Sequence, residues 1–247
     1  MGEIKLRYLG SKNKLSKELA PIIQLYITNE TNGYLEPFVG GANMIDKIVC
    51  CKRIGCDIHK ELIALLKHSQ YNSDEFPNLI LEEEYIKVRK NKEDYPNWYV
   101  GLVGFCSSFG AKYFGGYARD SKNDNSGKWS QGAIKNLKNQ IPQIIDVSFL
   151  NMKFQDIPLD KIHNYVIYCD IPYKGTTKYS DQNFPYDEFY DWCRKLSVDN
   201  IVLISEYDMP SDFECIWQKE TKVLLDSGKD KVDKSNVRVE KLFIFKG

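Results

Sequence analysis

Strand and helix signals alternate at both ends of the chain, and this alternation limits the possible folds more than any other feature. The apolar runs GYLEPF (33–38) and RIGCDI (53–58) indicate strands. We interpret GANMIDKIVCCK (41–52) and KELIALLKHSQ (60–70), which follow them, as helices. A series of this kind is typical of a parallel sheet with helices on both faces, an α/β fold.

The alternation stops in the middle of the chain and resumes near its end. Residues 71–145 contain no convincing strand, whereas EEEYIKVRKNK (82–92) has a helical pattern. Strand signals return at DVSFLNM, NYVIYCD and NIVLISEY, a helix at YDEFYDWCRKLS, and a final strand pair at KVLLD and VEKLFIFK. We therefore predict one domain built from residues 1–70 and 146–247, with a helical insertion at 71–145.

The composition excludes several classes of protein. The 34 basic and 34 acidic side chains balance, so any affinity for nucleic acid must come from a local patch. The 7 cysteines are odd in number and show no zinc-type spacing with the histidines, so we expect neither a disulfide framework nor a metal. This cysteine usage indicates a reducing, cytoplasmic setting. The opening segment does not resemble a signal peptide, and no apolar run is long enough to span a membrane.

Glycines follow the first predicted strand of the sheet. Glu36 and Phe38 end that strand, and Gly40 and Gly41 form the turn after it. Such a turn is either a tight structural connection or a place where a ligand approaches the backbone. Asp57 ends the next strand, where it can accept hydrogen bonds from ribose hydroxyls or cap the following helix.

The segment DIPY, residues 170–173, has the most specific chemistry in the sequence. Asp170 ends a strand, and its carboxylate can accept a hydrogen bond from an exocyclic amine. Pro172 keeps Ile171 extended, so that the Ile171 carbonyl can accept the second amine hydrogen. Tyr173 offers an aromatic face for a base. These groups favour a pocket for a base that has left its duplex.

Taken in order, RYLGSKNKL, EPFVGGANM, CDIH and DIPY resemble the Dam-type (D12 class) adenine-N6-specific DNA methyltransferases. GFCSSFGAKYFGGYAR and LISEYDMPSDFECIW resemble the phage-related branch of that family. The resemblance covers nearly the whole chain. It implies a Rossmann-like methyltransferase sheet that uses S-adenosyl-L-methionine, with an inserted target-recognition domain, and double-stranded DNA as the partner.

The resemblance also assigns residues to the cofactor. It places Tyr8 and Lys12 against S-adenosyl-L-methionine, and Glu36, Phe38, Gly40 and Gly41 around its methionine part. It gives the ribose to Asp57 and the adenine amino group to Asp156, which on sequence alone could equally cap a turn. Asp170 would face both the cofactor and the target base.

The family mechanism is direct transfer. Asp170 and the carbonyl of Ile171 bind the N6 hydrogens, and the nitrogen attacks the sulfonium methyl group with no metal and no covalent enzyme intermediate. The family motif is usually Asp-Pro-Pro-Tyr, and here Ile171 replaces the first proline. Isoleucine supplies the same carbonyl but not the fixed φ angle.

The segment from Ser107 to Gln140 is basic and rich in aromatic residues, and we expect it to contact DNA. It has six cations against two anions, Asp120 and Asp124. The predicted DNA-binding residues are Lys112, Tyr113, Arg119, Lys122 and Lys128. Lysine and arginine would contact phosphates, and Arg119 could reach a base edge. The alternative is a solvated loop whose aromatic residues pack inward.

Other functions remain compatible with these residues. The two acceptors would serve cytosine N4, or an RNA base, as well as adenine N6. A homologue that binds cofactor or DNA without catalysis would also fit, with Ile171 as its sign. The recognition sequence, a paired restriction enzyme and the oligomeric state are open, and a monomer is compatible with the sequence.

Overall fold

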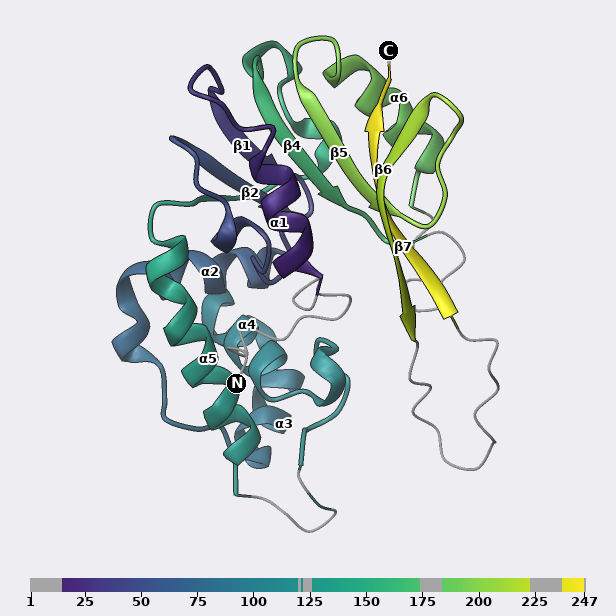
Figure 1. Ribbon diagram of the computed structural model, residues 1–247. Coiled ribbons are helices and arrows are strands. Elements are labelled where there is room, and N and C mark those ends of the chain that lie inside the picture. Colours follow the sequence, from purple (N-terminus) through teal and green to yellow (C-terminus); the bar gives the residue numbers. More distant parts are fainter. Residues whose placement is uncertain (1–14, 120, 122–125, 174–183, 223–236, 247) are drawn as a thin grey trace.

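The computed structural model describes residues 15–119, 121, 126–173, 184–222 and 237–246 (Figure 1). Predicted strands and helices at both ends of the chain are confirmed, except for the helix at 41–52 and the strand KVLLD, which are treated below. The helices are α1 (Ser16–Gln24), α2 (Lys60–Asn72), α3 (Glu82–Lys90), α4 (Asn97–Cys106), α5 (Lys128–Ile144) and α6 (Tyr186–Leu196). The strands are β1 (Gly33–Glu36), β2 (Arg53–Asp57), β3 (Ser148–Asn151), β4 (Tyr165–Asp170), β5 (Ile201–Glu206), β6 (Phe213–Lys222) and β7 (Val237–Phe245).

The strands form a single seven-stranded sheet. Their order is β3-β2-β1-β4-β5-β7-β6, and the first five are parallel while β7 runs antiparallel to both β5 and β6. The chain order reverses between β1 and β4, which makes this pair the topological switch point of the sheet. In open α/β sheets, ligands bind outside the carboxyl ends of the strands at such a point.

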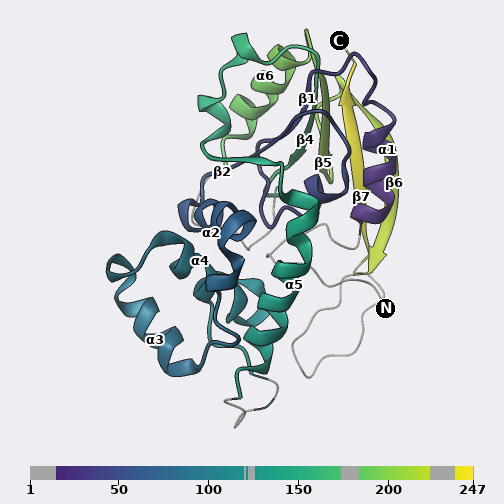
Figure 2. The same ribbon diagram turned by 90° about the vertical axis from the view of Figure 1, so that its left-hand side faces the viewer.

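Two hydrophobic cores lie on opposite faces of the sheet. Alternate residues of β4 point to different cores, with Val166 and Tyr168 in one and Ile167 and Cys169 in the other. Helix α1 covers the first face and α6 the second, as both views show (Figures 1 and 2). Because both faces are covered, β4 reads as a continuous apolar run instead of an alternating one.

The predicted insertion forms α3, α4 and α5, which gather with α2 below the sheet in Figure 1. Helices α2 and α4 pass very close to one another at Gly101, where a Cβ atom would lie 2.3 Å from the carbonyl oxygen of Glu61. At the other side of this group, Gln140 of α5 contacts Gly41 and Ala42, which follow β1. The helices therefore adjoin the carboxyl edge of the sheet.

The helix predicted for residues 41–52 is wrong. The structure has only a 3-10 turn, Ile45–Lys47 (η1), between β1 and β2. The guanidinium group of Arg53 donates to the carbonyls of Ile45 and Ile48, and the Ile45 carbonyl also accepts from the backbone N–H of Ile48 within the 3-10 turn. Ala42 has a φ of +57°, a left-handed conformation that a right-handed helix does not contain.

The final strand pair begins earlier than the sequence indicated. Strand β6 covers Phe213–Lys222 and pairs with β7, whereas most of the predicted strand KVLLD (222–226) lies outside the described residues. Within the described ranges, none of the helices has the length and apolar composition that crossing a bilayer needs.

Candidate functional site

Carboxylates end four of the five parallel strands. Glu36 is the last residue of β1, Asp57 of β2, Asp170 of β4 and Glu206 of β5. Since the carboxyl ends of parallel strands meet at one edge of a sheet, that edge is lined with acidic groups around the switch point. An edge of this kind favours a ligand with positive charge or with N–H and O–H donors. Glu206 was not predicted as a site residue.

Glu36 is deeply buried, with 2% of its surface exposed. It accepts a hydrogen bond of 2.8 Å from the hydroxyl of Tyr34. Burial raises the pKa of Glu36 well above its usual value, and the charges of Asp46 and Asp170 raise it further. The hydrogen bond from Tyr34 and the charge of Lys47 oppose this rise. Glu36 and Asp170 are thus electrostatic neighbours across the switch point.

The glycine turn after β1 is held by the acid that ends β2. Asp57 Oδ2 accepts a hydrogen bond of 3.1 Å from the backbone N–H of Gly40, which has a φ of +49°. Asp57 Oδ1 accepts one of 2.9 Å from the N–H of His59, the N-cap residue of α2. Burial raises the pKa of the Asp57 carboxyl, and these two hydrogen bonds oppose the rise. Each oxygen keeps a lone pair for a further donor.

Phe38 and Asp156 lie on the side of the sheet that α6 covers. The ring of Phe38 is half-buried and lies 5.7 Å from the ring of Phe154 and 5.8 Å from that of Phe189. Asp156 is exposed at the end of the 3-10 turn that begins at Phe154. The two residues therefore belong to adjacent segments. The other two predicted cofactor residues, Tyr8 and Lys12, lie outside the described residues.

The segment Asp170–Tyr173 follows β4 directly. Asp170, partly exposed, pairs in register with Ser205 of β5. The side chain of Ile171 is 3% exposed and belongs to the hydrophobic core beneath α6. The carbonyl of Pro172 accepts a hydrogen bond of 2.8 Å from the hydroxyl of Tyr186 in α6. The segment is therefore held against α6 both by the packing of Ile171 and by the hydrogen bond from Tyr186.

Tyr173 is held by residues that the sequence analysis missed. Its hydroxyl donates a hydrogen bond of 2.8 Å to Glu240 in β7. Its ring forms a T-shaped pair with the ring of Tyr207, with 4.4 Å between the ring centroids. Arg238 in turn donates to the hydroxyl of Tyr207 over 3.2 Å. No local signal could have identified these partners, because they follow Tyr173 by more than 30 residues and lie on β7 or directly after β5, which come close to Tyr173 only in the folded sheet.

The predicted DNA-binding residues differ in their surroundings. Lys112 and Lys128 are exposed, and Lys122 lies outside the described residues. Arg119 forms an ion pair with Glu82 at the start of α3. Tyr113 is half-buried, with its ring 4.4 Å from the ring of His59, and so is in contact with the helical core.

The described residues contain no group of three or more histidine, cysteine or acidic side chains arranged to hold a metal ion. The described site consists instead of carboxylates, backbone groups and aromatic rings.

The fold defines an α/β protein with a Rossmann-like sheet whose carboxyl edge is acidic around the switch point, with a helical segment next to the same edge. The model of the D12 class N6 adenine-specific DNA methyltransferases matches residues 8–197, and the chain belongs to this family. The family and the Rossmann-like methyltransferase fold expected from the sequence are therefore confirmed.

Two solved structures show a weak likeness to the chain. A candidate methylase from Haemophilus influenzae is 12% identical, with 95% of this chain and 99% of that chain covered and a TM-score of 0.38. A candidate methyltransferase from Thermoplasma acidophilum is also 12% identical, with coverage of 46% and 53% and a TM-score of 0.24. No curated protein matched the chain.

Proposed function

We propose that this protein transfers a methyl group from S-adenosyl-L-methionine to N6 of an adenine that has left duplex DNA. Membership of the family supplies the reaction class, adenine-N6 methylation of DNA. The observation that supports the finer proposal most is the position of Asp170-Ile171-Pro172-Tyr173 at the switch point, where β4 adjoins β1. A ligand beyond the carboxyl ends of these two strands would meet the DIPY segment after β4 and the glycine turn after β1.

The acidic edge fits this cofactor. S-adenosyl-L-methionine supplies an electrophilic methyl group on a positively charged sulfur and also has an ammonium group and ribose hydroxyls. Glu36 at the end of β1 would bind the positive methionine part, and Asp57 would accept from the ribose through its remaining lone pairs. Gly40 and Gly41 permit close approach to the backbone, because neither has a Cβ atom.

The remaining cofactor contacts come from both flanks of the turn. Phe38 offers a partly exposed ring, and Asp156 would accept from the adenine amino group of the cofactor. Tyr8 and Lys12 complete the proposed set of cofactor-binding residues, and the family resemblance is the sole basis for including them.

The DIPY segment would bind the target base. The Asp170 carboxylate and the Ile171 carbonyl would accept the two N6 hydrogens, which keeps electron density on the nitrogen that reacts. Asp170 ends the central strand β4 and Ile171 follows it directly with its side chain buried in the core, so both acceptors would be in place before the reaction. The ring of Tyr173 would stack on the base, and Glu240 keeps that ring in one orientation through the hydroxyl.

The helical insertion would contact the DNA. Its exposed lysines, Lys112 and Lys128, are suited to phosphates, as is the predicted residue Lys122. Arg119 is already paired with Glu82, so a role on DNA would require it to exchange this partner for a phosphate or base. Tyr113 would act by supporting the lysines from within the helical core. We accordingly propose residues 1–70 and 146–247 as the catalytic domain and 71–145 as the target-recognition domain.

The decisive experiment is transfer of tritiated methyl from S-adenosyl-L-methionine to unmethylated DNA and, in a parallel reaction, to RNA, followed by nucleoside analysis of the product. We expect N6-methyladenine. Labelled N4-methylcytosine, or label in RNA alone, would reject the assignment of the target. The absence of transfer, with S-adenosylhomocysteine and DNA still bound, would identify a homologue that does not catalyse.

A further inference from the structure

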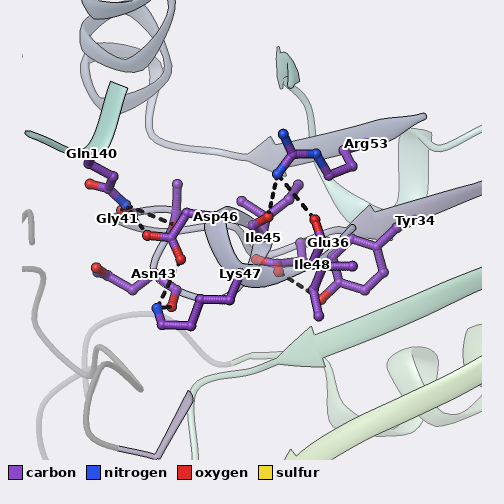
Figure 3. A network of polar contacts seen from close by, with 11 residues as sticks. Tyr34, Glu36, Gly41, Asn43, Ile45, Asp46, Lys47, Ile48, Arg53 and Gln140 are labelled. Atoms are coloured by element: carbon purple, nitrogen blue, oxygen red, sulfur yellow. Dashed lines mark hydrogen bonds and ion pairs between the residues drawn. The ribbon is translucent and has the colours of Figure 1, made fainter. Parts of the chain in front are cut away.

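The last helix of the insertion holds the loop after β1 through one buried side chain. Gln140 in α5 is fully buried, and its Nε2 lies 3.1 Å from the carbonyl oxygen of Gly41, 3.0 Å from that of Ala42 and 3.0 Å from Asp46 Oδ2 (Figure 3). The amide has two hydrogens, which these three acceptors share. The Ala42 carbonyl also accepts from the N–H of Asp46, and Asp46 is also paired with Lys47, so loss of the donor would chiefly remove the connection between α5 and the loop.

This loop depends on outside support for its conformation. Gly40 has a φ of +49° and Ala42 a φ of +57°. A left-handed conformation is unfavourable for alanine, and a residue keeps it only where its surroundings impose it. The loop contains no α-helix that could fix its shape, only the 3-10 turn η1. The contacts from α5 therefore add to the hydrogen bond between Asp57 and Gly40 and to the backbone hydrogen bonds within the loop, such as that from Ala42 to Val39.

A second connection joins the end of the same loop to the end of α5. Arg53, which begins β2, donates to the carbonyls of Ile45 and Ile48 over 2.8 and 3.3 Å (Figure 3). The same guanidinium forms an ion pair with Asp146, two residues after α5. Gln140 thus joins the start of the loop to α5. Arg53 joins the end of the loop to Asp146, just after α5.

Helix α5 extends from a predicted DNA contact to this loop. Lys128, its first residue, is exposed, and Gln140 lies 12 positions later in the same helix. A rise of 1.5 Å per residue separates the two positions by about 18 Å along one helix. A continuous helix transmits displacement or ordering from one end to the other, and the loop at its far end contains two of the proposed cofactor residues, Gly40 and Gly41.

We propose that Gln140 is a positioning residue that couples DNA bound on the insertion to cofactor affinity. The inference rests on the proposed function, since it assumes that the glycine turn binds S-adenosyl-L-methionine. DNA that orders α5 would hold the loop in its binding shape through Gln140. Such coupling is reciprocal, so bound cofactor would strengthen DNA binding by the same factor.

The test is the affinity for tritiated S-adenosylhomocysteine with and without excess unmethylated plasmid DNA. In the wild-type protein, DNA should raise this affinity about tenfold, within the usual range for coupled sites. Gln140→Leu keeps the size of the side chain and removes the donor, so the increase should fall to less than twofold. Its affinity for DNA without cofactor should stay near that of the wild type.

Gln70→Leu is the matched control. Gln70 is also a buried glutamine, and its Nε2 donates to the carbonyls of Ile144, Ile145 and Val147 over 2.7, 3.2 and 2.9 Å. None of these acceptors is in the loop after β1. This variant should lower the melting temperature as Gln140→Leu does and still keep the tenfold increase. Equal loss of coupling in both variants would overturn the proposal and indicate a general effect of instability.

Two outcomes separate this inference from the proposed function. If the wild type does not bind S-adenosylhomocysteine, the cofactor assignment fails. If it binds but DNA does not change the affinity, or if Gln140→Leu keeps the increase, the coupling is rejected and the cofactor assignment stands. Should Gln140→Leu not fold, hydrogen exchange on the wild type decides. DNA alone should slow exchange of the amides of residues 40–46, and unchanged exchange there would overturn the proposal.

Discussion

The hydroxyl of Tyr173 donates a hydrogen bond of 2.8 Å to Glu240, which lies 67 residues later in the chain on β7. The aromatic residue of the DIPY segment is thus oriented by a strand near the other end of the sequence. Burial raises the pKa of the Tyr173 hydroxyl well above its usual value, and the charges of Asp170 and Glu240 raise it further. The hydroxyl therefore stays protonated and remains a donor to Glu240.

Tyr173→Phe and Tyr173→Ala separate the two properties of this side chain. Tyr173→Phe keeps the stacking ring, and we expect methyl transfer close to the wild-type rate with a loss of about 1 kcal/mol in stability from the missing hydrogen bond. Tyr173→Ala should weaken capture of the base by ~1–3 kcal/mol. Single-turnover transfer at varied DNA concentration measures both. Equal effects of the two variants would show that the hydroxyl, not the ring, is required.

Asp170→Ala should lower the single-turnover rate by ~10²–10³, because it removes an acceptor aimed at the reacting amine. Binding of S-adenosylhomocysteine and the melting temperature show whether the variant is folded. Asp187→Ala, which removes an exposed acid in the first turn of α6, is the control and should transfer at the wild-type rate. Wild-type transfer by Asp170→Ala would mean that the DIPY segment is a structural turn.

Ile171 contributes a buried side chain to the core and a backbone carbonyl to the proposed base pocket, and substitutions can separate these two roles. Its side chain is buried in the core beneath α6, so Ile171→Ala should destabilise the protein by about 2–5 kcal/mol in urea unfolding. Ile171→Pro restores the usual family motif and keeps the carbonyl, and its transfer rate should stay within about tenfold of the wild type. A folded but inactive Ile171→Pro would show that the residue contributes more than its carbonyl.

Glu36 should make stability fall as the pH rises. Its folded pKa lies well above the usual 4.5, chiefly because of burial, so the native state binds the proton more tightly than the unfolded state. The contribution of Glu36 to stability begins to fall near pH 4.5 and is fully lost once the pH exceeds its folded pKa. Glu36→Gln keeps an acceptor for Tyr34 and removes the charge, so the stability of the variant relative to the wild type should increase through this range. Urea unfolding of both proteins from pH 4 upward measures this difference in stability. A difference that does not change with pH would show that the pKa of Glu36 is not raised in the folded protein.

Lys112 and Lys128 test the DNA-contacting surface. Both are exposed, and replacing the two by alanine should reduce the slope of log affinity against log salt by roughly 0.9 for each lost phosphate contact. Cofactor binding should be unchanged. The control replaces Lys161 and Lys195, two exposed lysines outside the insertion, and should keep the wild-type slope. A wild-type slope in the first double variant would place the DNA surface elsewhere.

The sequence by itself determined the α/β class, the positions of most strands and the acids at the ends of β1, β2 and β4. These features are local. Apolar runs mark the buried strands, and a carboxylate directly after such a run lies at the carboxyl edge wherever the strand is placed in a parallel sheet. The order of the motifs along the chain was likewise sufficient for the family.

Only the tertiary structure decided the shape of the loop after β1 and the partners of the site residues. GANMIDKIVCCK has a few good helix formers in Ala42, Met44 and its two lysines, but Gln140 and Arg53 bind its carbonyls and Ala42 adopts a left-handed conformation. Glu240 reaches Tyr173, and the side chain of Ile171 is buried, only because distant segments pack together. Contacts between residues up to a hundred positions apart leave no periodic pattern in the sequence, and their free energy outweighs the local helix preference of the segments that they join.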